Sequence, residues 1–589
     1  MIRETTQFLA PFNKGYSKRN DYDIYPSFST NENEIVEGYE TLVDEIQNER
    51  CLILDGYVGV DWNEISTAIT TLLEKKGKEV NIINVNEYLK PEEELEKMIS
   101  PFLGGDDPVF GRIANFTLAD YFDNEKINNI CSDDKADIKI IYGSGASLSK
   151  IEGFLVYFDL PKNELQYRMR SKSITNLGIN YSKDSKQMYK HFYFIDWVVL
   201  NAEKKKLLPE IDIIVDQQRP NVPVWMKGKG LRNTLSKMSQ NYFRVRPWFE
   251  PGVWGGDWMK SRFNQLNSEV PNYAWSFEMI VPENGIMLEN KGRLLEVSFD
   301  MLMFHQRENI LGKAAKRFKD EFPIRFDFLD TFNGGNLSVQ CHPSPNYIKK
   351  HFGENFTQDE TYYILDAEKD TSVYLGFQEG INPDEFKAAL DHSYRTKEVL
   401  DIEKFVQKLP SKKHDLFLIP HGTIHCSGTD NMVLEISATP YIYTFKMYDW
   451  QRLDLEGNPR PLNIDRAFEN LNFDRQGETV QNTLVSKPCI EATGENWKKI
   501  HLPTHPDHFY DIYRYEFQNE IMIDTLNQCH VLMLVEGTSI ELEVNDIETQ
   551  IFNYAETFAV PAAAKQYKLI NRGNAIAKVI VSFVKDEAC

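Results

Sequence analysis

The pattern of apolar runs changes along this chain, and the change limits which folds its parts can adopt. Short, continuous apolar runs occur at residues 51–56, 80–85, 138–143 and 154–159, with a helical pattern from about residue 63 to residue 76 between the first two. Continuous apolar strands that alternate with helices are typical of a parallel sheet covered on both faces. We therefore predict an α/β domain with a parallel, doubly wound sheet over residues 1–235.

The rest of the chain has a different pattern. Short strands rich in valine, isoleucine and aromatic residues recur with turn residues between them, as in a β-sandwich or jelly roll. A chain of 589 residues is also too long for one hydrophobic core. We predict a β domain over residues 236–490 with a helical insertion at about 381–408, and a second β domain over residues 491–589. In the latter, His530 has no second histidine and carboxylate at matching positions, so we expect a metal-free barrel.

Charge and cysteine use limit the partners and the compartment. The chain has 66 lysine and arginine residues against 88 acidic residues, a net charge of −22, and no polybasic block. This composition argues against binding to nucleic acid or to an anionic membrane. The first residues lack the apolar stretch of a signal peptide, no apolar run is long enough to span a bilayer, and the seven cysteines form no CxxC pair. We expect a cytoplasmic protein whose partner is a small molecule.

Three segments of the predicted 236–490 domain carry candidate metal ligands. His342 lies in Leu-Ser-Val-Gln-Cys-His-Pro, Glu360 begins Glu-Thr-Tyr-Tyr-Ile-Leu, and His425 ends Pro-His-Gly-Thr-Ile-His. Two imidazoles and one carboxylate from separate strands can hold one divalent ion and leave a coordination position open, which is typical of a catalytic site. The pattern therefore favours an enzyme.

A strand, a glycine and a helix near residue 56 invite comparison with the phosphate-binding P-loop, GxxxxGK[ST]. Asp61, Trp62 and Asn63 stand at the positions of the second glycine, the lysine and the hydroxyl residue. The loop therefore lacks the groups that hold the phosphates and magnesium.

The order of elements in this part nevertheless resembles that of P-loop nucleoside kinases of the uridine kinase and phosphoribulokinase type. Residues 159–164, followed by Arg168 and Arg170, extend the resemblance. It implies a degenerate P-loop domain that has lost phosphoryl transfer and serves as a scaffold, a regulator or an oligomer contact. The other interpretation is nucleotide binding in a changed mode, for which residues 142–147 are the remaining glycine-rich candidate.

Residues 245–466 resemble the class I phosphomannose isomerases, which are zinc-dependent enzymes of the cupin (jelly-roll) fold. The resemblance rests on residues 253–256, 337–343, 360–365, 419–425, 434–436, 448–450 and 459–462. It implies that His342, Glu360 and His425 bind one zinc ion, with Gln340 as a possible fourth ligand. Gln340 and His342 are two residues apart, so they share one face of a strand.

The resemblance also implies an activity, namely the interconversion of mannose 6-phosphate and fructose 6-phosphate through a cis-enediol. Lys446 would supply positive charge, and Glu435 would lie near the reacting carbons as a base or an orienting group. The alternatives are an isomerase or epimerase of another sugar and a non-catalytic, sugar-sensing cupin.

Three positions depart from the family pattern. Gln358 stands where the family usually has a lysine, and Lys446 stands where it usually has an arginine, one residue later relative to Glu435. A lysine does not reproduce the two-pronged guanidinium, so recognition of a 6-phosphate is weakened. His421 replaces a small residue, and it is either a contact near the site or an exposed turn residue.

Overall fold

The chain divides into two compact units, which are described separately. The computed structural model describes residues 2–15, 21–30, 34–105, 107–130, 136–280, 283–455, 457–545 and 548–589. Unit 1 comprises Met1–Tyr16, Tyr25–Met238 and Pro282–Arg307, and unit 2 comprises Ser17–Ile24, Ser239–Val281 and Glu308–Cys589. A segment that follows part of unit 2 in the sequence thus returns to unit 1, and the domain limits at residues 235 and 490 stay predictions.

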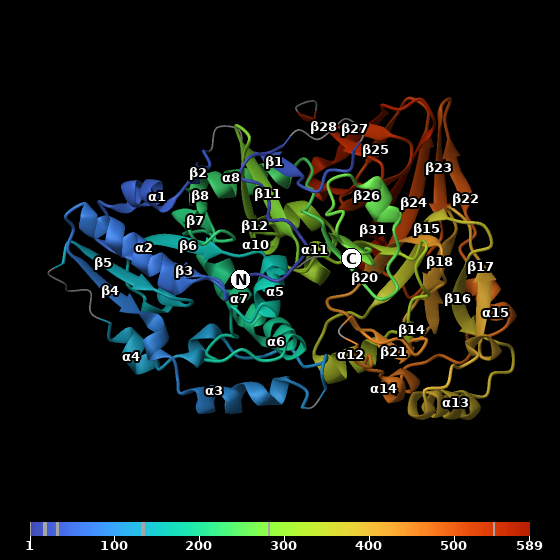
Figure 1. The fold of residues 1–589 in the computed structure, drawn as a ribbon. Coiled ribbons are helices and arrows are strands. Elements are labelled where there is room, and N and C mark those ends of the chain that lie inside the picture. Colours follow the sequence, from blue (N-terminus) through green and yellow to red (C-terminus); the bar gives the residue numbers. More distant parts are fainter. Residues whose placement is uncertain are drawn as a thin grey trace. The chain divides into compact units, whose positions relative to one another are not determined.

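Unit 1 is built on a mostly parallel sheet (Figure 1). In spatial order its strands are β2 (Val36–Glu37), β8 (Val224–Lys227), β7 (Ile213–Asp216), β6 (Phe154–Asp159), β3 (Cys51–Gly56), β5 (Ile138–Tyr142) and β4 (Val80–Asn84). Strands β7, β6, β3, β5 and β4 are parallel to one another, whereas β8 is antiparallel to β7 and β2 is antiparallel to β8. The four strands predicted from apolar runs are confirmed.

Helices connect these strands. They are α1 (Tyr39–Ile46), α2 (Trp62–Lys75), α3 (Glu92–Ile99), α4 (Asn124–Asn128), α5 (Lys162–Arg170), α6 (Ser185–His191), α7 (Trp197–Leu207) and α8 (Gly228–Met238). Helix α2 begins where Asp61 accepts a hydrogen bond from the backbone N–H of Glu64 at 3.1 Å, which caps the first turn. No helix in the described parts of the chain is long and apolar enough to cross a membrane.

The segment that returns to unit 1 contributes a small sheet and a buried charge. The sheet contains β1 (Ser27–Ser29), β11 (Gly285–Asn290) and β12 (Arg293–Ser298), and α10 (Asp300–Leu311) follows. Asp300 lies between two lysines: its carboxylate oxygens are 2.5 Å from Lys162 Nζ and 3.2 Å from Lys204 Nζ. Lys204 Nζ is also 3.0 Å from Asp159 Oδ1. We call Asp159, Lys162, Lys204 and Asp300 the charge cluster, and all four are buried.

Unit 2 contains two antiparallel sheets that supply the candidate site. In spatial order the six-stranded sheet has β18 (Leu416–Ile419), β15 (Asp359–Ala367), β20 (Asn431–Ala438), β13 (Arg325–Asp330), β10 (Trp275–Met279) and β9 (Trp248–Glu250). The five-stranded sheet has β17 (Val406–Pro410), β16 (Ser372–Phe377), β19 (His425–Ser427), β14 (Val339–Cys341) and β21 (Phe445–Tyr448). Most of these strands are almost wholly buried, whereas β17 at the edge of its sheet exposes Lys408 and Pro410.

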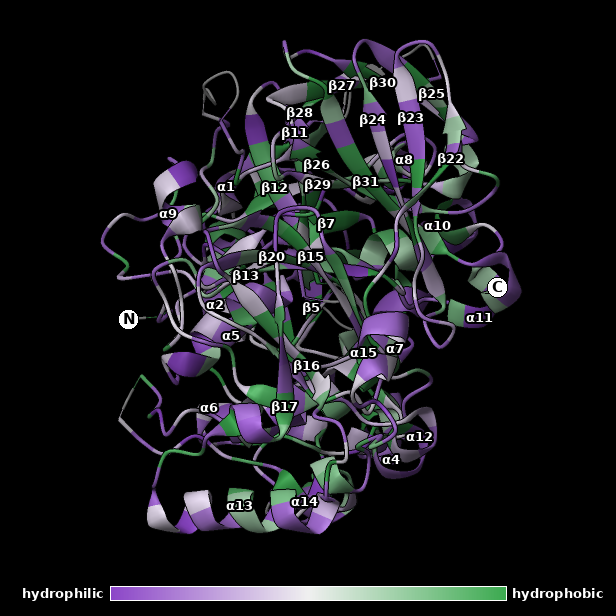
Figure 2. Cartoon of the chain, turned by 90° about the vertical axis from the view of Figure 1, so that its right-hand side faces the viewer, coloured by the Kyte–Doolittle hydropathy of each residue, from purple (hydrophilic) through white to green (hydrophobic). Residues whose placement is uncertain are grey.

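A second pair of sheets follows in the sequence. One has β22 (Cys489–Thr493), β23 (Trp497–Leu502), β24 (Tyr510–Phe517), β31 (Ala577–Val584), β26 (His530–Glu536) and β29 (Thr557–Val560), and the other has β25 (Glu520–Asp524), β30 (Gln566–Asn571), β27 (Ser539–Val544) and β28 (Glu548–Asn553). Hydrophilic and hydrophobic residues alternate along β27, which is typical of a strand with one buried face (Figure 2). His530 is buried here, and its Nδ1 lies 2.9 Å from Tyr567 OH.

Helices interrupt the β structure of unit 2. They are α9 (Trp258–Arg262), α11 (Ala315–Phe318), α12 (Pro345–Phe352), α13 (Pro383–Thr396), α14 (Ile464–Phe468) and α15 (Glu478–Thr483). Helix α13 lies in the predicted insertion and begins where Asn382 accepts backbone N–H groups of Asp384 and Glu385. The insertion is helical only to Thr396 and at Ile402–Lys404, because the chain then enters β17.

Candidate metal centre

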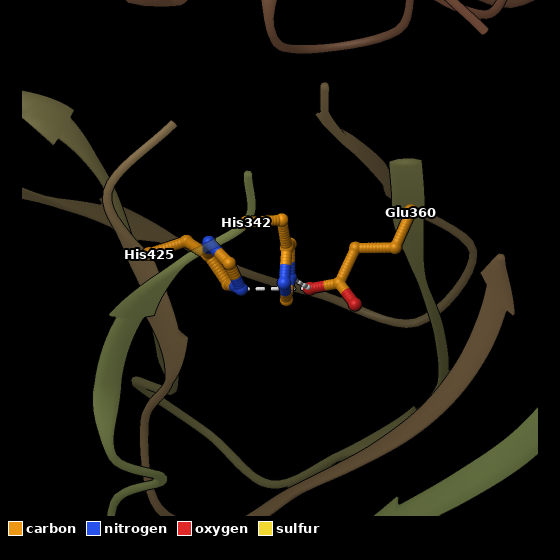
Figure 3. A group of neighbouring side chains, drawn as sticks. All are labelled: His342, Glu360 and His425. Atoms are coloured by element: carbon orange, nitrogen blue, oxygen red, sulfur yellow. Dashed lines mark ion pairs between the residues drawn. The ribbon is translucent and has the colours of Figure 1, made fainter. Parts of the chain in front are cut away.

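The three predicted ligands converge from separate strands of unit 2. Glu360 lies on β15 of the six-stranded sheet, His425 begins β19 of the five-stranded sheet, and His342 follows the last residue of β14. Their side chains point toward one another (Figure 3). Glu360 Oε1 lies 3.1 Å from His342 Nε2 and 2.7 Å from His425 Nε2, and all three residues are fully buried. We call these three residues the metal cluster.

Backbone carbonyls orient both imidazoles. His342 Nδ1 lies 2.9 Å from the carbonyl oxygen of Tyr443, and His425 Nδ1 lies 2.9 Å from that of Thr423. A carbonyl only accepts hydrogen bonds, so each Nδ1 carries a hydrogen and each Nε2 faces Glu360. This is the arrangement that second contacts impose on metal-binding histidines.

The other two predicted residues of the five-stranded sheet also lie here. Gln340 pairs in register with His425 on one side and with Lys446 on the other. Residues directly opposite on antiparallel strands point to the same face, so all three share the face of the metal cluster. Gln340 Nε2 lies 3.4 Å from His425 Nε2, so its amide group is beside the metal cluster and would bind an ion through Oε1.

Gln358, which departs from the family pattern, is occupied by protein contacts. Its Nε2 donates to Glu360 Oε2 at 3.2 Å, and its Oε1 accepts the backbone N–H of Tyr443 at 3.0 Å. It therefore orients Glu360 and supplies no positive charge.

Opposing effects set the charge of Glu360. Burial alone would raise its pKa, but the charges and hydrogen bonds of His342 and His425 more than offset burial and hold the pKa of Glu360 well below its ordinary value. Glu360 is therefore the ionised carboxylate that a divalent ion requires as a ligand.

Two further carboxyl groups lie on the same face of the sheet as Glu360, on the next two strands. Glu435 on β20 is directly opposite Asp327 on β13 and Tyr362 on β15. Burial and then the charges of Asp327 and Glu360 raise the pKa of Glu435 well above its ordinary value. Burial and the charge of Glu360 do the same for Asp327. Glu435 thus lies on the same face as Glu360, and its role in catalysis stays a prediction.

The loop that leads into His425 is held from two sides. Arg475 Nη1 donates to the carbonyl of Pro420 at 3.0 Å and to Thr423 Oγ1 at 2.7 Å. On the other side, Asp359 Oδ1 accepts the backbone N–H of His421 at 2.7 Å and lies 2.9 Å from its Nδ1. Asp359 points away from Glu360, its neighbour on the strand, so the His421 side chain contacts Asp359 rather than the metal cluster.

The donor set fits a divalent transition ion. The nitrogen and oxygen ligand atoms all lie within 4.8 Å of one another. Ligands at about 2.0–2.2 Å from a tetrahedral zinc would lie roughly 3.3 Å apart, close to the 2.7 Å and 3.1 Å between the ligand atoms here. Two imidazoles and one carboxylate, with Gln340 beside them, suit zinc and also cobalt, manganese or iron.

The glycine-rich segment of unit 1 binds a carboxylate of the protein itself. The backbone N–H groups of Gly145 and Ser147 both donate to the carboxylate of Asp55, each at 2.9 Å, and Gly56 donates to it at 2.7 Å. Donors that would face a phosphate in a working loop thus face a carboxylate of the protein itself. The degenerate P-loop domain stays a prediction.

Sequence reasoning missed Arg325, Asp327, Asp359 and Arg475. The alternating charges of the segment Arg325-Phe-Asp327-Phe within an apolar strand were a signal that one face of the strand is polar. No comparable signal marks Arg475, because its contacts depend on a loop 52 residues away in sequence.

Together, these features define a multidomain, largely β protein with a candidate metal site between two antiparallel sheets. Comparison with known sequences shows that this chain is similar to mannose-6-phosphate isomerases. Mannose-6-phosphate isomerase ManA of Bacillus subtilis is 26% identical over 231 residues, which cover 38% of this chain and 66% of that protein. Mannose-6-phosphate isomerase of Streptococcus mutans is 27% identical over 231 residues, which cover 38% of this chain and 65% of that protein. The chain thus spans just under two thirds of the length of these relatives.

A solved structure and a family model also match parts of this chain. The crystal structure of the mannose 6-phosphate isomerase from Bacillus subtilis matches with a TM-score of 0.48 and 19% identity, over 58% of this chain and 99% of that chain. A family model described as a domain of unknown function (DUF8485) matches residues 38–240, which lie within the part of the chain that holds the parallel sheet.

Proposed function

We propose that this chain is a zinc-dependent aldose–ketose isomerase that interconverts mannose 6-phosphate and fructose 6-phosphate through a cis-enediol. The observation that carries the proposal is the buried metal cluster, in which both imidazoles turn Nε2 toward an ionised Glu360. The names of the homologous proteins supply the sugar and the reaction.

In this proposal His342, Glu360, His425 and Gln340 hold the ion. A bound zinc ion supplies Lewis acidity, which stabilises negative charge on the sugar oxygens by several kcal/mol. The protein residues then perform the proton chemistry. Glu435 moves a proton between the first and second carbons or orients the sugar for that transfer, and Lys446, beside Gln340, adds fixed positive charge.

The experiment is to assay zinc-loaded protein for interconversion of the two sugar phosphates in both directions. Formation of each product from the other supports the proposal. Turnover only of another sugar selects the alternative of a different isomerase or epimerase, which the loss of a lysine at Gln358 favours. No turnover of any sugar by zinc-loaded protein contradicts an enzyme.

Replacing Arg475 by methionine should weaken metal binding by about 10- to 100-fold, as is usual when a contact that orients a ligand is lost. The reason is that the Pro420–Thr423 loop, whose Thr423 carbonyl orients His425, loses three hydrogen bonds, to the carbonyls of Pro420 and His421 and to Thr423 Oγ1. The measurement is the dissociation constant for Co²⁺, followed by its visible absorption. The matched control is Arg395→Met on exposed helix α13, and equal affinities in the two variants would contradict the assignment.

A further inference from the structure

A block of six polar side chains lies on the inner face of three adjacent strands of the six-stranded sheet. The register aligns these side chains in two rows across the strands. In one row, Ser437 lies between Arg325 and Glu360. In the other row, two residues away, Glu435 lies between Asp327 and Tyr362. Directly opposed residues point to one face, and residues two apart on a strand share that face. Because Glu360 is one of the three residues of the metal cluster, the whole block lies on the same face as that cluster. We call this block the polar wall.

Independent contacts agree with this register. The Tyr362 ring lies with its centroid 5.8 Å from that of His425 and nearly perpendicular to it. The charge of Glu360 reaches Asp327, Glu435 and Tyr362, where with burial it raises the pKa of each. These groups therefore surround one interior region.

Two atoms of the polar wall lack partners within the protein. Arg325 Nε and the hydroxyl of Tyr362 are buried and have no hydrogen-bond partner among the described residues. Buried donors without partners are uncommon and costly, which suggests that another molecule satisfies them. The metal ion would not satisfy these two atoms, because its proposed ligands are His342, Glu360, His425 and Gln340.

Arg325 supplies the positive charge that the departures from the family pattern leave in question. Gln358 is neutral, and Lys446 lies on the opposite sheet beside Gln340. The Arg325 side chain is 3% exposed, and its Nη2 donates to the carbonyl of Pro440 at 2.6 Å, which fixes the guanidinium and leaves Nε free.

The position of Arg325 indicates which part of a substrate it meets. It is two strands from Glu360, and neighbouring strands are about 4.8 Å apart, so the two backbones are separated by roughly 10 Å. A sugar whose first two carbons lie at the metal cluster would therefore present its other end to Arg325. A guanidinium matches the geometry of a phosphate better than an ammonium does.

Building on the proposed function, we infer that Arg325 binds the phosphate of a hexose 6-phosphate at the end remote from the metal cluster, and that Tyr362 donates to a hydroxyl of the same sugar. Asp327, beside Arg325, faces the same sugar and accepts hydrogen bonds from its hydroxyl groups. The polar wall thus determines substrate specificity, whereas the metal cluster and Glu435 act on the reacting carbons.

The test is calorimetric binding of two polyols that cannot react, sorbitol 6-phosphate and sorbitol, to zinc-loaded protein. Arg325→Met should weaken binding of sorbitol 6-phosphate by about 10- to 100-fold, the usual effect of losing a hydrogen bond to a charged group. Arg325→Lys should recover part of that loss, and binding of sorbitol should change less than about threefold. Zinc content should stay at the wild-type value. Arg514→Met, which removes an arginine bonded to Glu516 on β24, is the matched control.

Each outcome is decisive. Equal weakening for both polyols, loss of zinc from both Arg325 variants, or no binding of sorbitol 6-phosphate by the wild type overturns the inference, and the first two would assign Arg325 to holding Pro440. Selective loss of sorbitol 6-phosphate binding supports the inference even if the wild type turns over no sugar, a result that would count against the proposed function alone. Conversely, normal turnover with unchanged binding in Arg325→Met would contradict only the inference.

Discussion

Replacing His425 by alanine should remove bound zinc and reduce isomerisation to below about 0.1% of the wild-type rate, because several kcal/mol of transition-state stabilisation go with the ion and each 1.36 kcal/mol is a factor of ten. The substitution removes one of two imidazoles and leaves His342 and Glu360 facing a buried gap. One imidazole and one carboxylate, with only the neutral amide of Gln340 beside them, hold a divalent ion much less tightly than the full set does. Zinc content by mass spectrometry and turnover of mannose 6-phosphate are the two measurements.

The matched control for this variant is His392→Ala. His392 lies on helix α13, is exposed, and pairs with Glu398. It should keep one zinc ion per chain and full activity. A His425→Ala protein that also keeps its zinc and its activity would exclude the metal cluster as the site.

The second large effect concerns stability and arises in unit 1. Asp300→Asn should lower the free energy of unfolding of unit 1 by about 3–5 kcal/mol, the usual cost of breaking a buried ion pair from one side. Asp300 lies between Lys162 and Lys204, and all three side chains are buried. The asparagine is nearly the same size, so the loss would come from charge: among the described residues, Asp159 would be the one acidic partner left to the cluster, and it pairs with Lys204.

The sign of the pH dependence follows from the same cluster. Burial alone would raise the pKa of Asp300, but the charges of Lys162 and Lys204 more than offset it and lower the pKa. A carboxyl whose pKa is lower in the folded state contributes stability that is present at neutral pH and is lost as the pH falls through its folded-state pKa. The wild-type protein should therefore lose this contribution in acid, and Asp300→Asn should lack it at every pH.

Hydrogen exchange of the β6 and α7 amides reports the stability of this unit specifically, since the protein has two units and its unfolding need not be two-state. The control is Asp586→Asn, which breaks an exposed pair with Lys313 and should change stability by less than about 1 kcal/mol. Equal protection of the β6 amides in Asp300→Asn and the wild type would show that the charge cluster contributes little.

The sequence predicted the strands of the parallel sheet and the grouping of His342, Glu360 and His425, for different reasons, and the role of these three residues as metal ligands stays a prediction. Strands β3, β5 and β6 are buried on both faces, so their apolar runs are continuous and visible in one sequence, whereas β4 at the edge of the sheet is only partly buried. His342, Glu360 and His425 were found because short motifs surround them.

Features that depend on register or on long-range return of the chain could not be predicted. A single sequence does not say that Asp327 lies opposite Glu435, because a shift by one residue would place it on the other face. Likewise, β11 and β12 have the same short-strand pattern as unit 2, yet they belong to unit 1, and Asp300 meets Lys162 across 138 positions of sequence.

The most direct test of the account is conversion of mannose 6-phosphate to fructose 6-phosphate by the purified protein as isolated, after chelation, and after one equivalent of zinc is restored. The account predicts turnover that is lost on chelation and returns with zinc. Turnover that survives complete removal of metal, or a fully zinc-loaded protein that converts no sugar, would contradict it.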